Sequence, residues 1–257
     1  MDVSRKQKIS VLIITLNEEL QIKSLLEDLD FADEIIVVDS FSIDHTISIV
    51  NSFKNVKLIQ NKFENYTSQR NFALDFASHN WVLFLDADEK LTPELKAEII
   101  SEINNPKQIS AYLVYRNFIF KNEKLRFSGW QTDKIFRLFD KSKCRYADEK
   151  LVHEKLIVNG EIAVLKNKIT HYSYTNYKDY KAKMTNYGIL KAQEKLKKGQ
   201  KSSVFMMIFH PLYRFLYQYL IRLGFLDGLK GIIICYLNAY SVFIRYKELQ
   251  KLTSSRI

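Results

Sequence analysis

Three carboxylates follow a run of bulky apolar residues in the first half of this 257-residue chain. In "NWVLFLDADE", residues 80–89, the apolar run 81–85 leads into Asp86, Asp88 and Glu89. Apolar runs of this kind are usually interior, whereas carboxylates are rarely interior without a partner. Asp86 and Asp88 stand at i and i+2 of an extended segment, so their side chains point the same way. Two close carboxylates repel unless a cation relieves them, and Mg²⁺ or Mn²⁺ suits such oxygen ligands when a substrate diphosphate completes the shell.

Polar residues follow two further apolar runs in the same manner. "ISVLIIT" (9–15) leads into "TLNEE", and "EIIVVD" (34–39) leads into "DSFSIDHT". These runs do not alternate apolar with polar residues, which predicts strands buried on both faces of a parallel sheet. Ligands of open α/β sheets bind at the carboxyl ends of the strands, so we expect the acids to converge on one edge. A structural alternative for Asp39 is a simple strand-end turn residue.

Helical segments separate these strands, and together they predict a doubly wound, mostly parallel α/β sheet. The expected elements are helices 17–29, 43–53 (Asp44 as a cap), 65–78 and 93–104 (Thr92 as a cap), a weaker strand at 56–60, and shorter strands from residue 111 onward. The chain contains neither G-x-G-x-x-G nor G-x-x-x-x-G-K-[ST], which excludes two common nucleotide-binding loops. Its two isolated cysteines do not have metal-ligand spacing.

Basic and apolar residues concentrate toward the C-terminus of the chain. The formal net charge is +10, and "KLKKGQK" (195–201) directly precedes a strongly apolar stretch. A basic helix at 176–197, an apolar helix at 204–223 and a second helix at 229–247 are predicted. The polar residues of the first apolar helix form one stripe, spaced by four: His210, Arg214, Gln218 and Arg222. We expect a hairpin that lies in the plane of a membrane or is shallowly embedded in it, aided by about 1 kcal/mol per basic residue near anionic lipid. The alternative is a hairpin packed on its own domain or on a dimer mate.

Taken together, these motifs resemble a known family. "SVLIITLNEE", "DEIIVVDSFSIDHT", "SQRNFALDFASHNWVLFLDADE" and "VHEKL" are similar to glycosyltransferases of family 2, which have the Rossmann-like GT-A fold. The resemblance is closest to the bacterial group that adds glucose to the inner core of lipopolysaccharide or lipooligosaccharide. It implies a GT-A domain at 1–175, with a nucleotide-binding half at about 1–110 and an acceptor half at about 111–175. Residues 176–257 would be the appended C-terminal helical segment.

The resemblance also implies roles for individual residues. Glu154 of "VHEKL" takes the position of the catalytic base, with Asp148 and Glu149 as rivals and an ordinary surface glutamate as the structural alternative. Asp88 would bind the metal, and Asp86 would lie near both the metal and the ribose. The residues expected to bind the nucleotide-sugar are Thr15, Asn17, Glu18, Asp39, Gln69, Arg70 and Asp86. Accessory or acceptor candidates are Trp130, His153 and His171, each of which has a purely structural alternative. Arg126, Lys134 and Arg137 are further candidates for acceptor phosphates, with solvated surface positions as the alternative.

The expected activity is an inverting, metal-dependent transfer of a single sugar, since the Q-x-x-R-W signature of processive synthases is absent. The expected donor is UDP-glucose, and the expected acceptor is a lipopolysaccharide core or another lipid-linked glycan at the cytosolic membrane face. Alternatives within the fold make a polyprenyl-phosphate sugar or a capsule or protein glycan. A non-catalytic membrane adaptor and a basic nucleic-acid-binding protein are alternatives of other classes. All the expected acids are present, which disfavours the adaptor, and the basic cluster borders an apolar hairpin, which disfavours nucleic acid.

Overall fold

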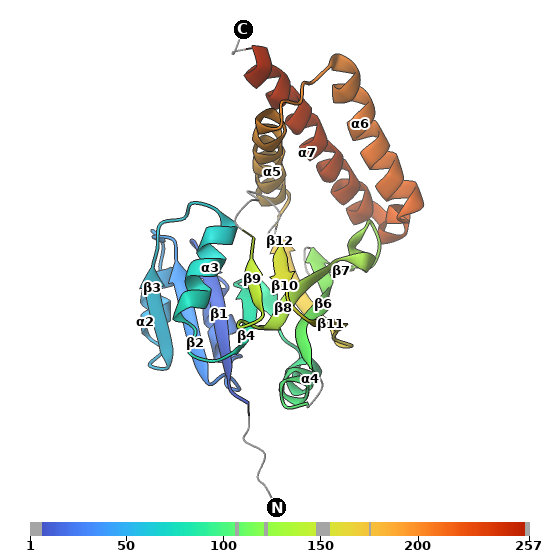
Figure 1. The fold of residues 1–257 in the computed structure, drawn as a ribbon. Helices are drawn as coiled ribbons and strands as arrows, with labels where there is room; N and C mark the ends of the chain where they lie inside the picture. Colours follow the sequence, from blue (N-terminus) through green and yellow to red (C-terminus); the bar gives the residue numbers. More distant parts are fainter. Residues whose placement is uncertain (1–6, 106–107, 121–122, 148–154, 175, 255–257) are drawn as a thin grey trace, which may run out of the picture. The chain divides into compact units, whose positions relative to one another are not determined.

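The computed structural model describes residues 7–105, 108–120, 123–147, 155–174 and 176–254 (Figure 1). The chain divides into two compact units. The first comprises Met1–Arg116 and Lys134–His171, and the second comprises Asn117–Asp133 and Tyr172–Ile257.

The first unit is built on a sheet whose parallel half has the strand order β3-β2-β1-β4. The chain therefore moves outward from β1 to β3 and then returns to the other side of β1 with β4. This reversal is the topological switch point of a doubly wound sheet, beside which such folds bind ligands. The strands are β1 (Ile9–Thr15), β2 (Glu34–Asp39), β3 (Val56–Gln60) and β4 (Trp81–Asp86).

Apolar side chains cover both faces of this parallel half. Along β4, Leu83 and Leu85 belong to the cluster on one face, while Val82 and Phe84 belong to the cluster on the other. Each fully buried side chain of this size contributes about 1.5–3 kcal/mol. Helix α3 packs on the Phe84 side, whereas α1, α2 and α4 pack on the opposite side. The helices are α1 (Ile22–Glu27), α2 (Thr46–Asn51), α3 (Tyr66–Phe76) and α4 (Pro93–Ile103).

The second half of the sheet is mixed. β8 runs antiparallel to β4, β6 runs antiparallel to β8, and β11 pairs with β6 in parallel. A separate two-stranded ribbon joins β9 to β10, and β12 pairs with the short strand β5 that follows the acids of β4. The strands are β5 (Glu89–Lys90), β6 (Ile109–Phe120), β8 (Lys134–Asp140), β9 (Cys144–Tyr146), β10 (Leu156–Val158), β11 (Glu161–Val164) and β12 (Ile169–Tyr174).

The second unit is mainly helical, and its long helix α7 lies between α5 and α6 (Figure 1). Gly188 of α5 makes the close approach to α7 possible, since a Cβ there would lie 2.7 Å from the carbonyl oxygen of Ser241. The elements are α5 (Tyr177–Lys197), α6 (Val204–Leu216), the π-helical turn η2 (Tyr217–Ile221), the 3₁₀ turns η1 (Trp130–Thr132) and η3 (Gly224–Asp227), α7 (Gly228–Ser254) and β7 (Glu123–Leu125).

The structure confirms the strands predicted at 9–15, 34–39, 56–60 and 81–86 with the same bounds. The prediction of a helix from residue 17 was wrong at its start, because Asn17 has a left-handed φ of 56° and α1 begins at Ile22. The cap expected from Thr92 is present, since its side chain accepts the Leu95 N–H at 3.2 Å. The second hairpin helix is longer than predicted and continues to Ser254.

Candidate active site

The switch point brings the ends of three strands together. In the parallel register Thr15 stands beside Asp39 of β2, and its neighbour Ile14 stands beside Asp86 of β4. The predicted convergence of strand-end acids on one edge of the sheet is therefore confirmed. The Thr15 hydroxyl is buried and has no hydrogen-bond partner within the described residues.

The loops that follow β1 and β2 are joined by reciprocal hydrogen bonds. The Asn17 N–H donates to the Ser42 hydroxyl at 2.8 Å, while the Asn17 side-chain oxygen accepts the Ile43 N–H at 2.9 Å. The Glu18 N–H donates to the Thr46 hydroxyl at 2.8 Å. These contacts hold Asn17 in its left-handed conformation, which asparagine tolerates better than most residues. The hydrogen bonds between "DSFSID" and Asn17, which we call the clasp, thus fix the loop after β1 to the loop after β2.

Asp39 and Gln69 form the floor of this edge. Both are fully buried. Ser42 donates to the Asp39 carboxylate from its backbone N–H at 2.8 Å and also from its hydroxyl. The Gln69 amide donates to the Ser40 hydroxyl at 3.0 Å and accepts from the Asn61 side chain at 2.8 Å. Through these buried hydrogen bonds, Asp39 and Gln69 fix the conformation of the loops that follow β2 and β3.

Two arginines hold the carboxylate of Asp86. Arg70 donates to its Oδ1 at 2.9 Å, and Arg137 donates to its Oδ2. Burial by itself raises the pKa of Asp86, but the positive charges of Arg137 and Arg70 outweigh that effect and hold it well below the ordinary value of 3.8. The alternative of a solvated surface position for Arg137 was wrong, because this residue is only 4% exposed.

Glu89 is the second anion of this cluster and is completely buried. Its Oε1 accepts from Arg137 at 2.7 Å, and its Oε2 accepts the backbone N–H of Asp86 at 3.1 Å. Arg116 lies 3.9 Å from the same carboxylate. Glu89 therefore ties the chain around the "DADE" turn to the charged cluster beneath it.

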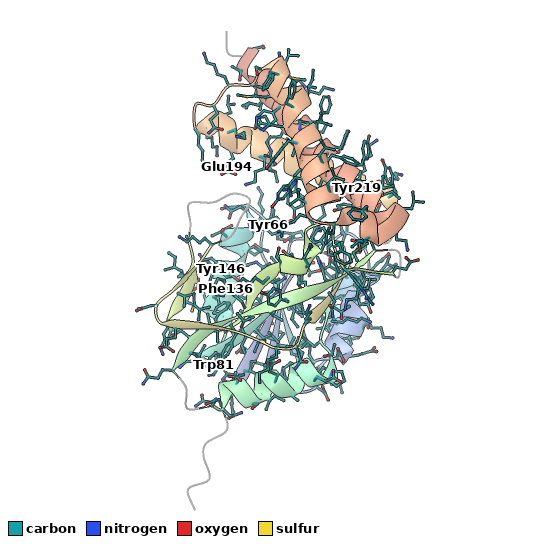
Figure 2. All side chains as sticks on the ribbon, turned by 90° about the vertical axis from the view of Figure 1, so that its right-hand side faces the viewer. Tyr66, Trp81, Phe136, Tyr146, Glu194 and Tyr219 are labelled. Atoms are coloured by element: carbon teal, nitrogen blue, oxygen red, sulfur yellow. The ribbon has the colours of Figure 1, made fainter. Side chains whose placement is uncertain are left out.

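Aromatic rings position Arg70. Its guanidinium lies over the Phe84 ring at 5.1 Å and over the Tyr146 ring at 5.8 Å, within cation–π range. Asn71 fixes this part of β9, because its side-chain amide donates to the Tyr146 carbonyl at 2.9 Å and its oxygen accepts the Tyr146 N–H at 3.1 Å. Tyr146 is labelled in Figure 2 near Phe136, which packs against the same apolar cluster. The ion pairs thus rest on a packed aromatic base.

Asp88 faces a different partner, His171 of β12. The Asp88 Oδ2 and His171 Nε2 atoms are 3.2 Å apart, and the two side chains are 18% and 10% exposed. The pairing of His171 with Glu89 in the β12–β5 ladder brings the histidine to this position. Of the two aspartates, Asp88 is the one that offers its carboxylate beside an imidazole.

The pair formed by Asp88 and His171 fits a divalent cation. Two ligands in adjacent octahedral positions, each about 2.1 Å from a metal, lie about 3 Å apart, close to the observed separation. The described residues include no cluster of three or more candidate metal ligands among His, Cys, Asp and Glu, so these two side chains require a substrate diphosphate or water to complete a shell. An imidazole ligand favours a transition ion such as Mn²⁺ over Mg²⁺, which prefers oxygen.

The predicted base and the remaining accessory candidates belong to the second unit or lie outside the described residues. Trp130 lies in the second unit, where its ring stacks on Phe118 with centroids 3.7 Å apart. The expected base Glu154, its rivals Asp148 and Glu149, and His153 all lie outside the described residues. Sequence reasoning missed the structural roles of Glu89 and Arg137. One feature of the sequence could have indicated the role of Arg137. This residue interrupts the apolar side of "KIFRLF", which is the pattern expected of a buried arginine paired with an acid at the end of a neighbouring strand.

Comparison with known proteins identifies relatives over nearly the full chain. Residues 10–160 match the model of the family described as Glycosyl transferase family 2. An uncharacterized glycosyltransferase of Rickettsia typhi is 30% identical, and the alignment covers 96% of this chain and 88% of that protein. The lipopolysaccharide core biosynthesis glycosyltransferase LpsC of Rhizobium meliloti is 25% identical, with 94% of both chains covered. Among solved structures, residues 1–349 of TarS from S. aureus align with a TM-score of 0.47 and 16% identity, covering 97% of this chain and 92% of that one.

Proposed function

Because the chain belongs to glycosyl transferase family 2, we propose that it moves one glucose from UDP-glucose to a lipopolysaccharide-core or other lipid-linked glycan acceptor. The protein is a glycosyltransferase, and its first unit has the GT-A fold. The acceptor class is supported by the similarity to a protein named for lipopolysaccharide core biosynthesis. Such an acceptor places the enzyme at the inner face of the cytoplasmic membrane.

The observation that carries the proposal is the placement of Asp88 and His171 at the switch point, 3.2 Å apart. Asp88 and His171 would hold a divalent cation, whose positive charge would make the diphosphate of the donor a better leaving group. Arg70 and Arg137 neutralise Asp86 at the same edge, so that its carboxylate does not repel an anionic donor. The clasp between Asn17 and Ser42 presents the loop after β1 to the nucleotide.

The proposed base is Glu154. It takes the proton of an acceptor hydroxyl while that oxygen attacks the anomeric carbon from the side opposite the diphosphate. The bond from that carbon to the diphosphate oxygen breaks and UDP leaves, which inverts the configuration. This part of the proposal rests on the position of Glu154 within "VHEKL".

A donor screen tests the proposal directly. The purified chain is incubated with UDP-, GDP- and ADP-sugars and either Mn²⁺ or Mg²⁺, and the released nucleoside diphosphate is measured. We expect turnover of UDP-glucose with the metal and a loss of at least about 100-fold in Asp88→Asn, the scale of a lost transition-state electrostatic contact. Asp75→Asn is the matched control, because Asp75 is an exposed acid of α3 whose carboxylate pairs with Arg145 at the protein surface. Equal turnover in Asp88→Asn and Asp75→Asn would refute the role of Asp88.

A further inference from the structure

The second unit exposes an unusual amount of apolar surface. More than half of the large apolar side chains exposed in the described chain fall between residues 204 and 236. Helix α6 has no buried residue at all. We use the term outer face for the exposed apolar side chains Val204, Phe205, Ile208, Phe209, Leu212, Tyr213, Leu216, Leu220, Ile221, Phe225, Leu226 and Leu229.

Polar side chains of the same segment contact other parts of the unit; Gln218 is buried, whereas His210 and Arg214 are exposed. Gln218 is 5% exposed and donates to the Ser128 carbonyl at 3.2 Å. Arg222 donates to the Thr132 hydroxyl at 2.8 Å, and the His210 ring stacks on Tyr246 of α7 with centroids 4.9 Å apart. A surface helix in water places its apolar stripe against the core. Here the apolar side chains are exposed, and the buried Gln218 lies on the side that contacts the rest of the unit.

Aromatic rings reinforce the outer face. Phe205 and Phe209 stack with centroids 4.1 Å apart, and Tyr213 stacks on Tyr217 at 5.9 Å. Tyr219, labelled in Figure 2, meets the Phe225 ring at 6.1 Å. Tyrosine in particular prefers the boundary between hydrocarbon and water, because its ring is apolar and its hydroxyl is polar.

The lengths and the packing indicate how this face meets a bilayer. Helix α6 and the adjoining turn η2 form eighteen consecutive helical residues, 204–221, which extend about 27 Å, slightly less than the hydrocarbon core of about 30 Å. Residues Gly224–Ser254 are long and apolar enough to cross a membrane by length and composition, but 44% of the most apolar stretch is buried within the structure. Ile234, Cys235 and Leu237 are fully buried, which makes α7 the core helix of its unit. The outer face therefore suits an in-plane position.

Basic side chains stand at the edge of the outer face. A hollow of about 460 Å³ is lined by β7 and the start of α7, including Lys124, Arg126, Lys230 and Leu226. The Asp227 carboxylate accepts hydrogen bonds from the backbone N–H groups of Arg126 and Phe127, and Lys230 forms an ion pair with Glu123 at 2.6 Å. The lining therefore has one net positive charge, from three basic and two acidic side chains, and the exposed Lys124 and Arg126 carry positive charge beside Leu226 of the outer face.

We propose that the outer face lies in the interfacial layer of an anionic phospholipid bilayer, with the Lys124/Arg126 hollow against lipid phosphates. This deepens the proposed function, because it names the surface that carries the site to a lipid-linked acceptor. Apolar burial supplies binding to any bilayer, while Lys124 and Arg126 add selectivity for anionic lipid that weakens with salt.

Vesicle sedimentation of the full chain separates the two contributions. Vesicles of phosphatidylcholine are compared with and without phosphatidylglycerol at low and high salt. We expect Phe209→Glu to reduce the bound fraction at least fivefold on both vesicle types. The double variant Lys124→Glu/Arg126→Glu should bind phosphatidylcholine vesicles like wild type. Unlike that of wild type, its bound fraction should not increase when the vesicles contain phosphatidylglycerol. Ile162→Glu is the matched control, since Ile162 of β11 is 50% exposed and Phe209 is 51% exposed.

Three outcomes would overturn the inference. The first is that the wild-type chain stays in the supernatant, and the second is that Phe209→Glu and Ile162→Glu reduce the bound fraction equally. The third is that the wild-type chain binds no vesicles and forms a dimer, which Phe209→Glu converts into a monomer. The last result would assign the face to a second copy of the chain. UDP-glucose hydrolysis without vesicles is measured in parallel and should be unchanged in all variants. Vesicle binding without hydrolysis would contradict the proposed function and leave the membrane face intact.

Discussion

The buried carboxylate of Glu89 links the backbone of Asp86 to the guanidinium of Arg137. One oxygen accepts the Asp86 N–H at 3.1 Å, and the other accepts from Arg137 at 2.7 Å. Because Arg137 also binds the Asp86 side chain, the three residues form a closed ring of contacts. The turn that contains Asp88 is therefore held in place by Glu89, whose own side chain is completely buried.

Glu89→Gln tests this ring. Removing one charge of a buried ion cluster leaves its partner uncompensated and costs about 3–5 kcal/mol. We expect a loss of that size in the free energy of unfolding, measured by urea denaturation. Asp75→Asn breaks the exposed Asp75–Arg145 pair and should cost no more than about 1 kcal/mol. Equal costs in the two variants would contradict the structural role of Glu89.

The metal preference is expected to depend on His171. Replacing its imidazole in His171→Gln should weaken the apparent affinity for Mn²⁺ by about 10–100-fold and lower the ratio of Mn²⁺- to Mg²⁺-supported turnover. Activation curves for both ions measure this. His79→Gln is the control, because His79 precedes β4 at the opposite end of the strand from Asp88. An unchanged ratio in His171→Gln would remove the histidine from the cation shell.

Glu194 of α5 predicts a specific pH dependence of stability. Hydrogen bonds from Lys198 and Lys191 lower its pKa from 4.5 to about 2. Between pH 2 and pH 4.5 the carboxylate therefore stays ionised in the folded state but is protonated in the unfolded state. The resulting stabilisation is fully present above pH 4.5 and is lost as the pH falls toward 2. The difference in unfolding free energy between wild type and Glu194→Gln should shrink from pH 6 to pH 3. A difference that stays constant over this range would contradict the assignment.

The α5–α7 contact predicts the effect of one added methyl group. In Gly188→Ala the new Cβ would meet the Ser241 carbonyl oxygen at 2.7 Å and the Ile244 side chain at 2.8 Å. Overpacking of this kind costs about 1–3 kcal/mol, although alanine has the higher helix propensity. Thermal unfolding should show a lowered melting temperature. Gln193→Ala on the exposed side of α5 should change stability by no more than about 0.5 kcal/mol, and a stabilised Gly188→Ala would show that the helices are not in contact there.

The strands and the edge that carries the acids were predictable from the sequence. β1, β2 and β4 are continuous apolar runs that end in polar residues, and such runs form strands whether or not the rest of the chain is known. The helix after β1 was less predictable. Asn17 continues a helical pattern in sequence, but its hydrogen bonds to the loop after β2 hold it in a left-handed conformation. Such contacts join residues 25 or more positions apart, which local patterns do not record.

What the sequence determined by itself is the order of strands and helices, the family, and the acids at the ends of β2 and β4. Only the tertiary structure decided that Asp86 is held by Arg70 and Arg137 while Asp88 meets His171. It also decided that Gln218 of the predicted polar stripe is buried, while the apolar side of α6 is exposed. The physical reason is the same in both cases. Periodicity shows that a helix or strand has two sides, but which side is buried depends on the partners that folding brings from distant parts of the chain.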